Sequence, residues 1–147
     1  MNSNLIIWPV LAQVILTWLI FIILGIRKAK DVKAGNVDRS KAALDNKAWS
    51  VDVIKVSNNI ANQFQTPILF YVLSFIIFSL NIVTTISLAL AWIYVLSRYL
   101  HAYVHIGSNY VPYRMNLFLL GCITLIALTI YCVWMLAINS NALHILA

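Results

Sequence analysis

Four polar residues recur at helical spacing within a segment that is otherwise strongly apolar: Lys55, Asn58, Asn62 and Gln65. With about 3.6 residues per turn, these positions fall on one side of a helix. Hydrocarbon offers no partner to an amide or a cation, so this side must meet protein, water or a polar ligand. Two interpretations stay open, namely a ligand-binding face and hydrogen bonding between membrane helices.

A second polar face is predicted on a later apolar segment, where Arg98, His101 and His105 have the spacing of a single helix face. An arginine inside a membrane span is costly and by default indicates a functional site, although it can also snorkel to the lipid headgroups. The two histidines are suited to acid–base chemistry. No metal site is predicted, because the pair lacks a third ligand and the carboxylate of the H-E-x-x-H pattern.

Two further cations border these faces, because Arg27 follows the first apolar segment and Arg114 precedes the last. If the helices pack side by side, both cations lie near the same end as the polar faces. The sequence then predicts one electropositive, amide-lined pocket. Such a pocket suits a small anionic ligand that forms several hydrogen bonds.

The composition that must position these residues is that of an integral membrane protein. Apolar residues make up 63% of the chain and charged residues 10%, and the mean hydropathy is +0.90. A spanning helix needs about 20 apolar residues, and Pro67 is expected to bend the second such segment. We therefore predict one all-α membrane domain over residues 1–147, an antiparallel four-helix bundle. Its spans are expected at approximately 5–26, 59–80, 84–105 and 116–138.

Positive charge is concentrated in one long loop, at about residues 27–57, which holds eight of the ten basic residues and all four aspartates. By the positive-inside rule this loop is cytoplasmic and both termini lie outside, and we expect a bacterial inner membrane. The aromatic and basic residues do not alternate as they do in proteins that bind nucleic acid. The excess of basic residues is therefore explained by topology and by anionic lipid headgroups.

At these residues the chain resembles the MAPEG family, which includes the microsomal glutathione transferases, the leukotriene and prostaglandin E synthases, and bacterial relatives. Residues 62–71 resemble the bacterial pattern N-Q-F-E-x-P-x-L-F-Y. Residues 98–114 are similar to the third helix of the family and the loop that follows it. The likeness extends over all four predicted spans, in order and in length.

The resemblance implies a homotrimer that binds glutathione as co-substrate between neighbouring subunits, at the cytoplasmic side. Asn62 matches the asparagine that holds the ligand, Arg98 matches the arginine of the third helix, and Arg114 is the candidate for the cation that activates the thiol. His101 or His105 would orient the thiol or protonate the product. The full set expected to hold glutathione is Lys55, Asn58, Asn62, Gln65, Arg98 and Arg27, and the set expected to act on its thiol is Arg114, His101 and His105.

Two positions depart from the family pattern. Gln65 replaces a glutamate, and the chain contains no glutamate at all, while Asn58 stands where the glutathione-using enzymes have an arginine. Neutral hydrogen bonds of this kind are roughly half as strong as charge-assisted ones. The sequence therefore predicts a glutathione-dependent transferase or peroxidase that acts on lipophilic electrophiles. The alternatives are a non-catalytic trimer that binds a lipid or another metabolite, and a structural membrane subunit.

Overall fold

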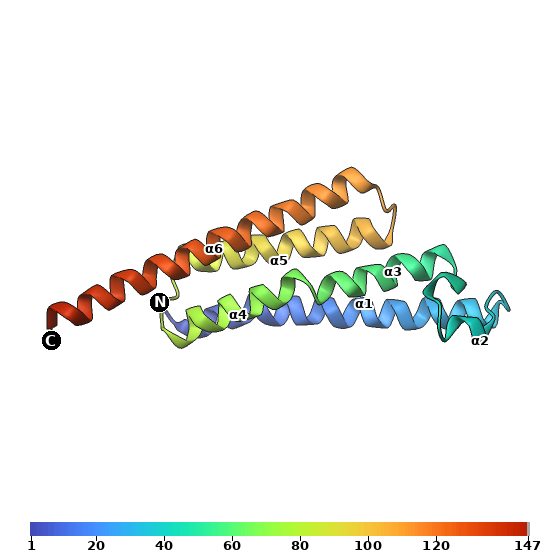
Figure 1. Cartoon of the computed structure of the whole chain (residues 1–147), viewed down its shortest axis with the longest axis horizontal. Coiled ribbons are helices and arrows are strands. Elements are labelled where there is room, and N and C mark those ends of the chain that lie inside the picture. Colours follow the sequence, from blue (N-terminus) through green and yellow to red (C-terminus); the bar gives the residue numbers. More distant parts are fainter. Residues whose placement is uncertain (147) are drawn as a thin grey trace.

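The computed structural model describes the backbone of residues 1–146 and the side chains of residues 1–138, and every regular element in that part is a helix. The long helices run alongside one another, with α1 next to α3 and α4, and α5 next to α6 (Figure 1). The most extensive contact joins α5 to α6. Ala147, the last residue of the predicted domain, lies outside the described residues. In chain order the elements are η1 (Ser3–Ile6), α1 (Ile7–Lys33), α2 (Arg39–Ala42), η2 (Asn46–Ala48), α3 (Val51–Gln63), α4 (Thr66–Ser79), α5 (Thr85–Ile106) and α6 (Val111–Leu146).

The first long helix, α1, continues past its predicted end at position 26 to Lys33. Pro9 lies in its first turn, where the missing N–H costs no hydrogen bond. Lys30 and Lys33 lie in its last turn, where cations interact favourably with the helix dipole. Gly35 follows with φ of 70°, a conformation in which glycine carries no steric penalty. The basic loop is therefore shorter than the predicted 27–57, because both flanking helices extend into it.

The predicted second span, 59–80, is two helices rather than one. α3 begins already at Val51 and ends at Gln63, and α4 begins at Thr66. Pro67 lies at the start of α4, and Gln65 before it has φ −101° and ψ −97°, outside the helical region. Because proline has no N–H to donate to the preceding turn and its ring crowds that turn, the helix stops and restarts. Pro67 thus interrupts the span, as expected of a helix-bending residue.

Local signals fix both ends of α5. Thr84 and Ser87 form a reciprocal capping box at its beginning. Asn81, with φ of 54°, allows the tight turn between α4 and α5. At the other end Gly107 follows the last helical residue. The long loop between α1 and α3 and the connection between α5 and α6 lie at the same end of the molecule (Figure 1).

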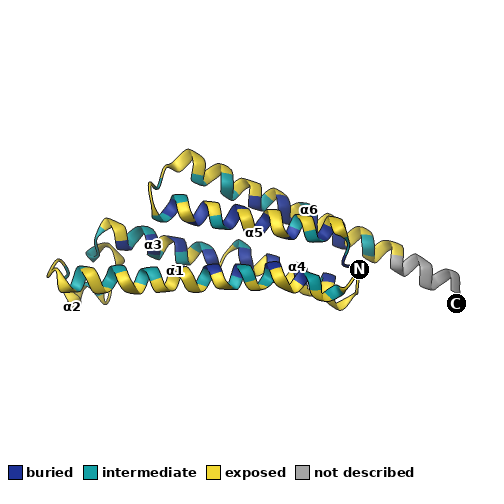
Figure 2. Ribbon diagram, turned by 180° about the vertical axis from the view of Figure 1, so that it is seen from behind, coloured by how far each residue is buried: buried dark blue, intermediate teal, exposed yellow. Residues whose placement is uncertain are grey.

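Buried residues gather where the helices meet, and the outward-facing positions of the described residues are mostly exposed (Figure 2). Phe70, Ile77 and Leu128 are completely buried between helices. Large apolar side chains cover the outside, such as Trp18, which is 65% exposed, and Phe75, which is 69% exposed. An apolar exterior is what a hydrocarbon environment requires, and large exposed apolar areas are rare on soluble monomers.

Three helical segments of the described chain are long and apolar enough to cross a membrane: Ser3–Lys33, Val51–Ser79 and Val111–Ile138. They correspond to the first, second and fourth predicted spans. The third predicted span coincides with α5 but is not among these three. Its mean hydropathy is reduced by Arg98, His101 and His105, which are also the residues that make α5 a candidate for function.

Candidate functional site

A cavity of about 240 Å³ lies between the α3–α4 break, α5 and the beginning of α6. Four of the nine site residues predicted from the sequence line it: Asn62, Gln65, His101 and Arg114. They come from three separate parts of the chain, so the fold brings together residues that the sequence could only place on individual helices. The complete lining is Asn62, Gln65, His101, Val111, Arg114, Met115 and Phe118.

Arg114 is held in place by two neutral partners. Its Nη1 atom donates to Oδ1 of Asn109 at 2.7 Å and lies 3.3 Å from Nε2 of His105. A guanidinium group has only donors, so His105 must accept through Nε2 and is the neutral tautomer with its proton on Nδ1. Arg114 lies near the N-terminus of α6, where the helix dipole is already positive and disfavours a cation. Its position therefore makes this end of the cavity electropositive.

Arg98 lies deeper, with none of its side chain exposed. The Nε, Nη1 and Nη2 atoms have no hydrogen-bond partner among the described residues, and the guanidinium carbon lies 5.4 Å from the centre of the Phe118 ring. No carboxylate side chain of this chain can reach it through the bundle, because every aspartate lies within 31–52 and there is no glutamate. Complete burial also contradicts the alternative that Arg98 snorkels to the headgroups.

His101 lies next to His105, which contacts Arg114, and next to Phe118, which contacts Arg98. It is buried in α5, its ring centre lies 5.5 Å from that of His105, and it lies 5.9 Å from that of Phe118. His101 lines the cavity, whereas His105 contacts Arg114 from behind the lining. The predicted face formed by Arg98, His101 and His105 is thus present, but only His101 borders the open space.

Arg27 and Lys55 do not line this cavity. Arg27 donates to the carbonyl oxygens of Asp52 at 2.8 Å and Ile106 at 3.1 Å, and Nζ of Lys55 lies 3.4 Å from the carbonyl oxygen of Gly107. Both cations therefore satisfy carbonyl groups at the C-terminal end of α5, where positive charge is favourable. Arg27 borders a separate cavity of about 290 Å³. The expected single pocket is divided in two within one protomer.

Asn58, on the same side of α3 as Asn62, is exposed on the surface of the protomer and does not line the cavity. The predicted stripe therefore runs from the cavity onto the outer surface of α3. Lys55, Asn58, Asn62 and Gln65 all keep some exposure, which leaves them available to a ligand or to a neighbouring protomer.

Hydrogen bonding between α1 and α3 is made by amides on an adjacent side of α3. Nε2 of Gln13 in α1 donates to Oε1 of Gln63 at 3.0 Å, and Nε2 of Gln63 donates to Oδ1 of Asn59 at 3.0 Å. All three side chains are buried. The sequence interpretation did not include Gln13. A single amide in an otherwise apolar helix is the feature that could have predicted it, because such an amide is expected to have a buried hydrogen-bond partner.

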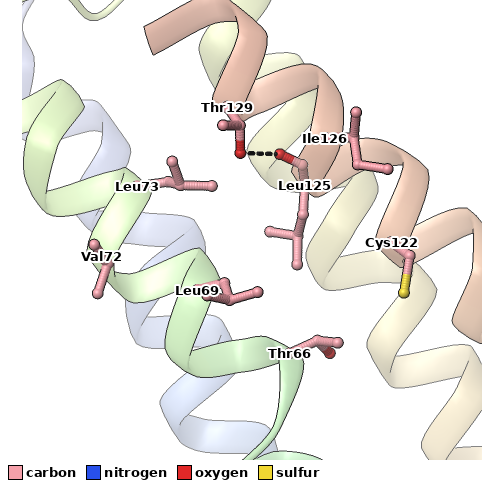
Figure 3. Close-up of a pocket in the computed structure, with 8 residues that line it drawn as sticks. All are labelled: Thr66, Leu69, Val72, Leu73, Cys122, Leu125, Ile126 and Thr129. Atoms are coloured by element: carbon pink, nitrogen blue, oxygen red, sulfur yellow. Dashed lines mark hydrogen bonds between the residues drawn. The ribbon is translucent and has the colours of Figure 1, made fainter. Parts of the chain in front are cut away.

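An apolar groove of about 410 Å³ lies between α4 and α6 (Figure 3). The side chains of Leu69, Leu73 and Leu125 point into the space between the helices (Figure 3). Its polar groups are already occupied: Thr129 donates to the carbonyl oxygen of Leu125 at 2.8 Å, and Thr66 accepts from the Tyr94 hydroxyl at 3.2 Å. The groove begins at Thr66, the residue after Gln65, and so lies beside the polar cavity.

Comparison with known proteins gave one match. The sequence model of the MAPEG family matches residues 5–134, a range that includes every residue lining the cavity and the groove. No curated protein and no solved structure matched the chain.

Proposed function

This chain belongs to the MAPEG family, and we propose that it is a membrane-bound glutathione-dependent transferase or peroxidase that acts on lipophilic electrophiles. The observation that carries the proposal is the polar cavity. It combines a guanidinium group, two amides and an imidazole, and its lining includes no carboxylate. This combination favours a small anion with several hydrogen-bonding groups, and glutathione is such a molecule.

The roles of the residues follow from their positions in the cavity. Asn62 and Gln65 would hydrogen-bond the peptide groups of glutathione, and Arg114 would stabilise its thiolate. In a transfer reaction the thiolate sulfur bonds to the electrophilic carbon, and either a leaving group departs or an added proton completes the product. His101, which lines the cavity, is placed to provide that proton, while His105 holds Arg114 through Nε2.

The apolar groove beside the cavity supports a lipophilic second substrate. It lies within the membrane-spanning part of the chain, and its polar groups are occupied, so an alkyl chain would meet only apolar surface. A substrate held there would have its reactive end near Thr66 and Gln65. The electrophile and the thiolate would then approach the same place from opposite sides.

We also infer a trimer of four-helix bundles, in which α5 crosses the membrane together with the three more apolar segments. Asn58 and the outer side of α3 would then meet a ligand at the boundary between two protomers. The exposure of Asn58 next to the half-buried Asn62 supports this arrangement. Native mass spectrometry of the detergent-solubilised protein is expected to show three copies of the chain, and a stable monomer would contradict it.

Binding and thiolate formation can be tested separately. The purified protein is titrated with glutathione by calorimetry, and thiolate formation is followed by ultraviolet absorbance. The analogue in which a methyl group replaces the thiol serves as the matched control. We expect both molecules to bind and only glutathione to give the thiolate signal. No binding at millimolar glutathione would contradict the proposal.

A specific observation favours a second candidate, a non-catalytic protein that binds an anionic lipid. Gln65 and Asn58 supply neutral amides where the family has charged residues, and the apolar groove adjoins the polar cavity. A lipid would place its headgroup in the cavity and its chain in the groove. Co-purified lipid in native mass spectra, without turnover of standard electrophiles, would favour this function over the first.

A further inference from the structure

Phe118 contacts the most deeply buried cation of the protein and also lines the polar cavity. One side of the ring lies against the Arg98 guanidinium, 5.4 Å from the ring centre, and the same residue forms part of the cavity wall. Arg98 itself does not line the cavity and is fully buried. Phe118 is only half-buried, and its ring centre lies 5.9 Å from that of His101, which also lines the cavity.

The contact with Phe118 compensates Arg98 only in part. A cation over an aromatic ring gains modest free energy, whereas a buried charge without hydrogen bonds or a counter-ion is costly. All three guanidinium nitrogens are without a partner in the described chain, and its carboxylates all lie in 31–52. A counter-ion for Arg98 must therefore come from outside these side chains, and the cavity that Phe118 also lines offers a place for one.

We propose that Phe118 closes an inner anion subsite, and that rotation of its ring lets an anionic group of the bound ligand pair with Arg98. Phe118 then acts as a specificity residue, since a ligand gains the inner contact only if its anionic group reaches past the ring. This inference rests on the proposed function for the identity of the ligand. The closure itself concerns only Arg98, Phe118 and the cavity.

Accessibility of Arg98 tests the closure without any need for glutathione. The detergent-solubilised protein is treated with the arginine reagent phenylglyoxal, and adducts on Arg98 are followed over time by mass spectrometry. We expect phenylglyoxal to modify Arg98 several-fold faster in Phe118→Ala than in the wild type. Leu128→Ala is the matched control, because it also removes buried apolar volume from α6 but lies farther along that helix. Equal Arg98 rates in all three proteins would overturn the proposal.

Glutathione binding tests whether the subsite is used. Dissociation constants are measured for the wild type, Phe118→Ala, Arg98→Gln and the double variant. Removing the ring removes the cation–π contact that the ligand must displace, so Phe118→Ala should bind about three- to tenfold more tightly. This gain should disappear when Arg98 is glutamine. An equal effect of Phe118→Ala in both backgrounds would overturn the role of Arg98.

The two measurements also distinguish the inference from the proposed function. If glutathione fails to bind the wild type while phenylglyoxal reaches Arg98 faster in Phe118→Ala, the proposed function fails and the closure stands. Phe118→Leu removes the ring but keeps apolar volume, and provides the same test if the alanine variant does not fold. For this variant also, an unchanged rate of Arg98 modification would contradict the closure.

Discussion

Arg98 and Arg114 have different surroundings, although both lie toward the same end of the bundle. Arg114 has a neutral amide and a neutral imidazole as partners, so its charge is oriented but not cancelled. Arg98 has no hydrogen-bond partner among the described residues, and its guanidinium group lies over the Phe118 ring. Positive charge that is fixed but not neutralised is what an anion-binding site requires, because the ligand supplies the missing counter-charge.

Arg114→Ala should abolish most of the proposed glutathione-dependent turnover. Loss of one positioned donor to a developing anion reduces kcat by about 10²–10³, and the thiolate signal should fall with it. Steady-state kinetics with a lipophilic electrophile measure the effect. Arg39→Ala is the control, because Arg39 lies on the exposed α2 helix, away from the cavity. Unchanged kcat in Arg114→Ala would assign the activation of the thiol to another group.

The combined change Gln65→Glu and Asn58→Arg should strengthen glutathione binding by about five- to tenfold. It replaces two neutral hydrogen bonds by charge-assisted ones, each of which is worth about 1 kcal/mol more, and part of that gain is lost to solvent screening at these exposed positions. Calorimetric titration of the variant and the wild type gives the ratio. Unchanged binding would show that these two side chains do not contact the ligand, and weaker binding would contradict the expected charge-assisted contacts.

At the scale of elements, α3 presents different polar groups on its two sides. Gln63 accepts a hydrogen bond from Gln13 of α1 and donates one to Asn59, while Asn62 turns to the cavity. The bond to Gln13 therefore fixes the rotation of α3, and with it the direction of Asn62. Within one protomer, the buried hydrogen bonds and the cavity lining therefore involve adjacent sides of the helix.

Gln13→Leu should destabilise the protein by about 0.5–2 kcal/mol, because Oε1 of Gln63 loses its donor in a buried place. The double variant with Gln63→Leu should recover little of this loss, because Oδ1 of the buried Asn59 then loses the donor that Gln63 supplies. Unfolding in mixed detergent micelles measures both. Ile15→Leu, on the exposed side of α1, is the control and should be near neutral. A Gln13→Leu variant as stable as this control would contradict the structural role of the bond.

Gly121→Leu should be destabilising by about 1–3 kcal/mol, because α5 and α6 approach closely at this glycine. A Cβ atom there would lie 3.1 Å from Oγ of Ser97 and 3.6 Å from Cε2 of Tyr94. Gly25→Leu is the matched change, since nothing lies within 4 Å of its Cβ position. Thermal unfolding of the two variants should differ clearly; equal midpoints would mean that α5 and α6 are less closely packed.

At the scale of the whole molecule, charge and helices together predict one orientation. The long basic loop and the connection that leads to Arg114 lie at the same end of the bundle, and the N-terminus lies toward the other end (Figure 1). Under the positive-inside rule we expect the end with the loop to be cytoplasmic. The polar cavity lies on that side and would be reached from the cytoplasm, whereas the apolar groove would be reached from the bilayer.

Cysteine labelling tests this orientation. In a background with Cys122 and Cys132 replaced by alanine, single cysteines are placed at Asn4 and Lys41, both exposed. A membrane-impermeant maleimide should label Asn4→Cys in intact bacterial spheroplasts and Lys41→Cys only after lysis. Labelling of the loop cysteine in intact cells would reverse the proposed topology.

The sequence by itself determined that the protein is helical, membrane-spanning and a member of its family. Bilayer thickness sets the length of apolar segments, and helical periodicity sets which residues share a face. It also identified Asn62, Gln65, His101 and Arg114, because polar residues in hydrocarbon require partners. Helix ends were placed less well at 26 and 59, since a helix can continue through charged residues that are good helix formers.

Only the tertiary structure decided which polar residues meet. Periodicity gives directions around one helix, but the contacts between helices depend on how those helices rotate and pack. Packing directed Arg27 and Lys55 to the carbonyl end of α5, joined Gln13 to Gln63, and placed Phe118 over Arg98. None of these pairs is close in the chain, so no local pattern could have revealed them.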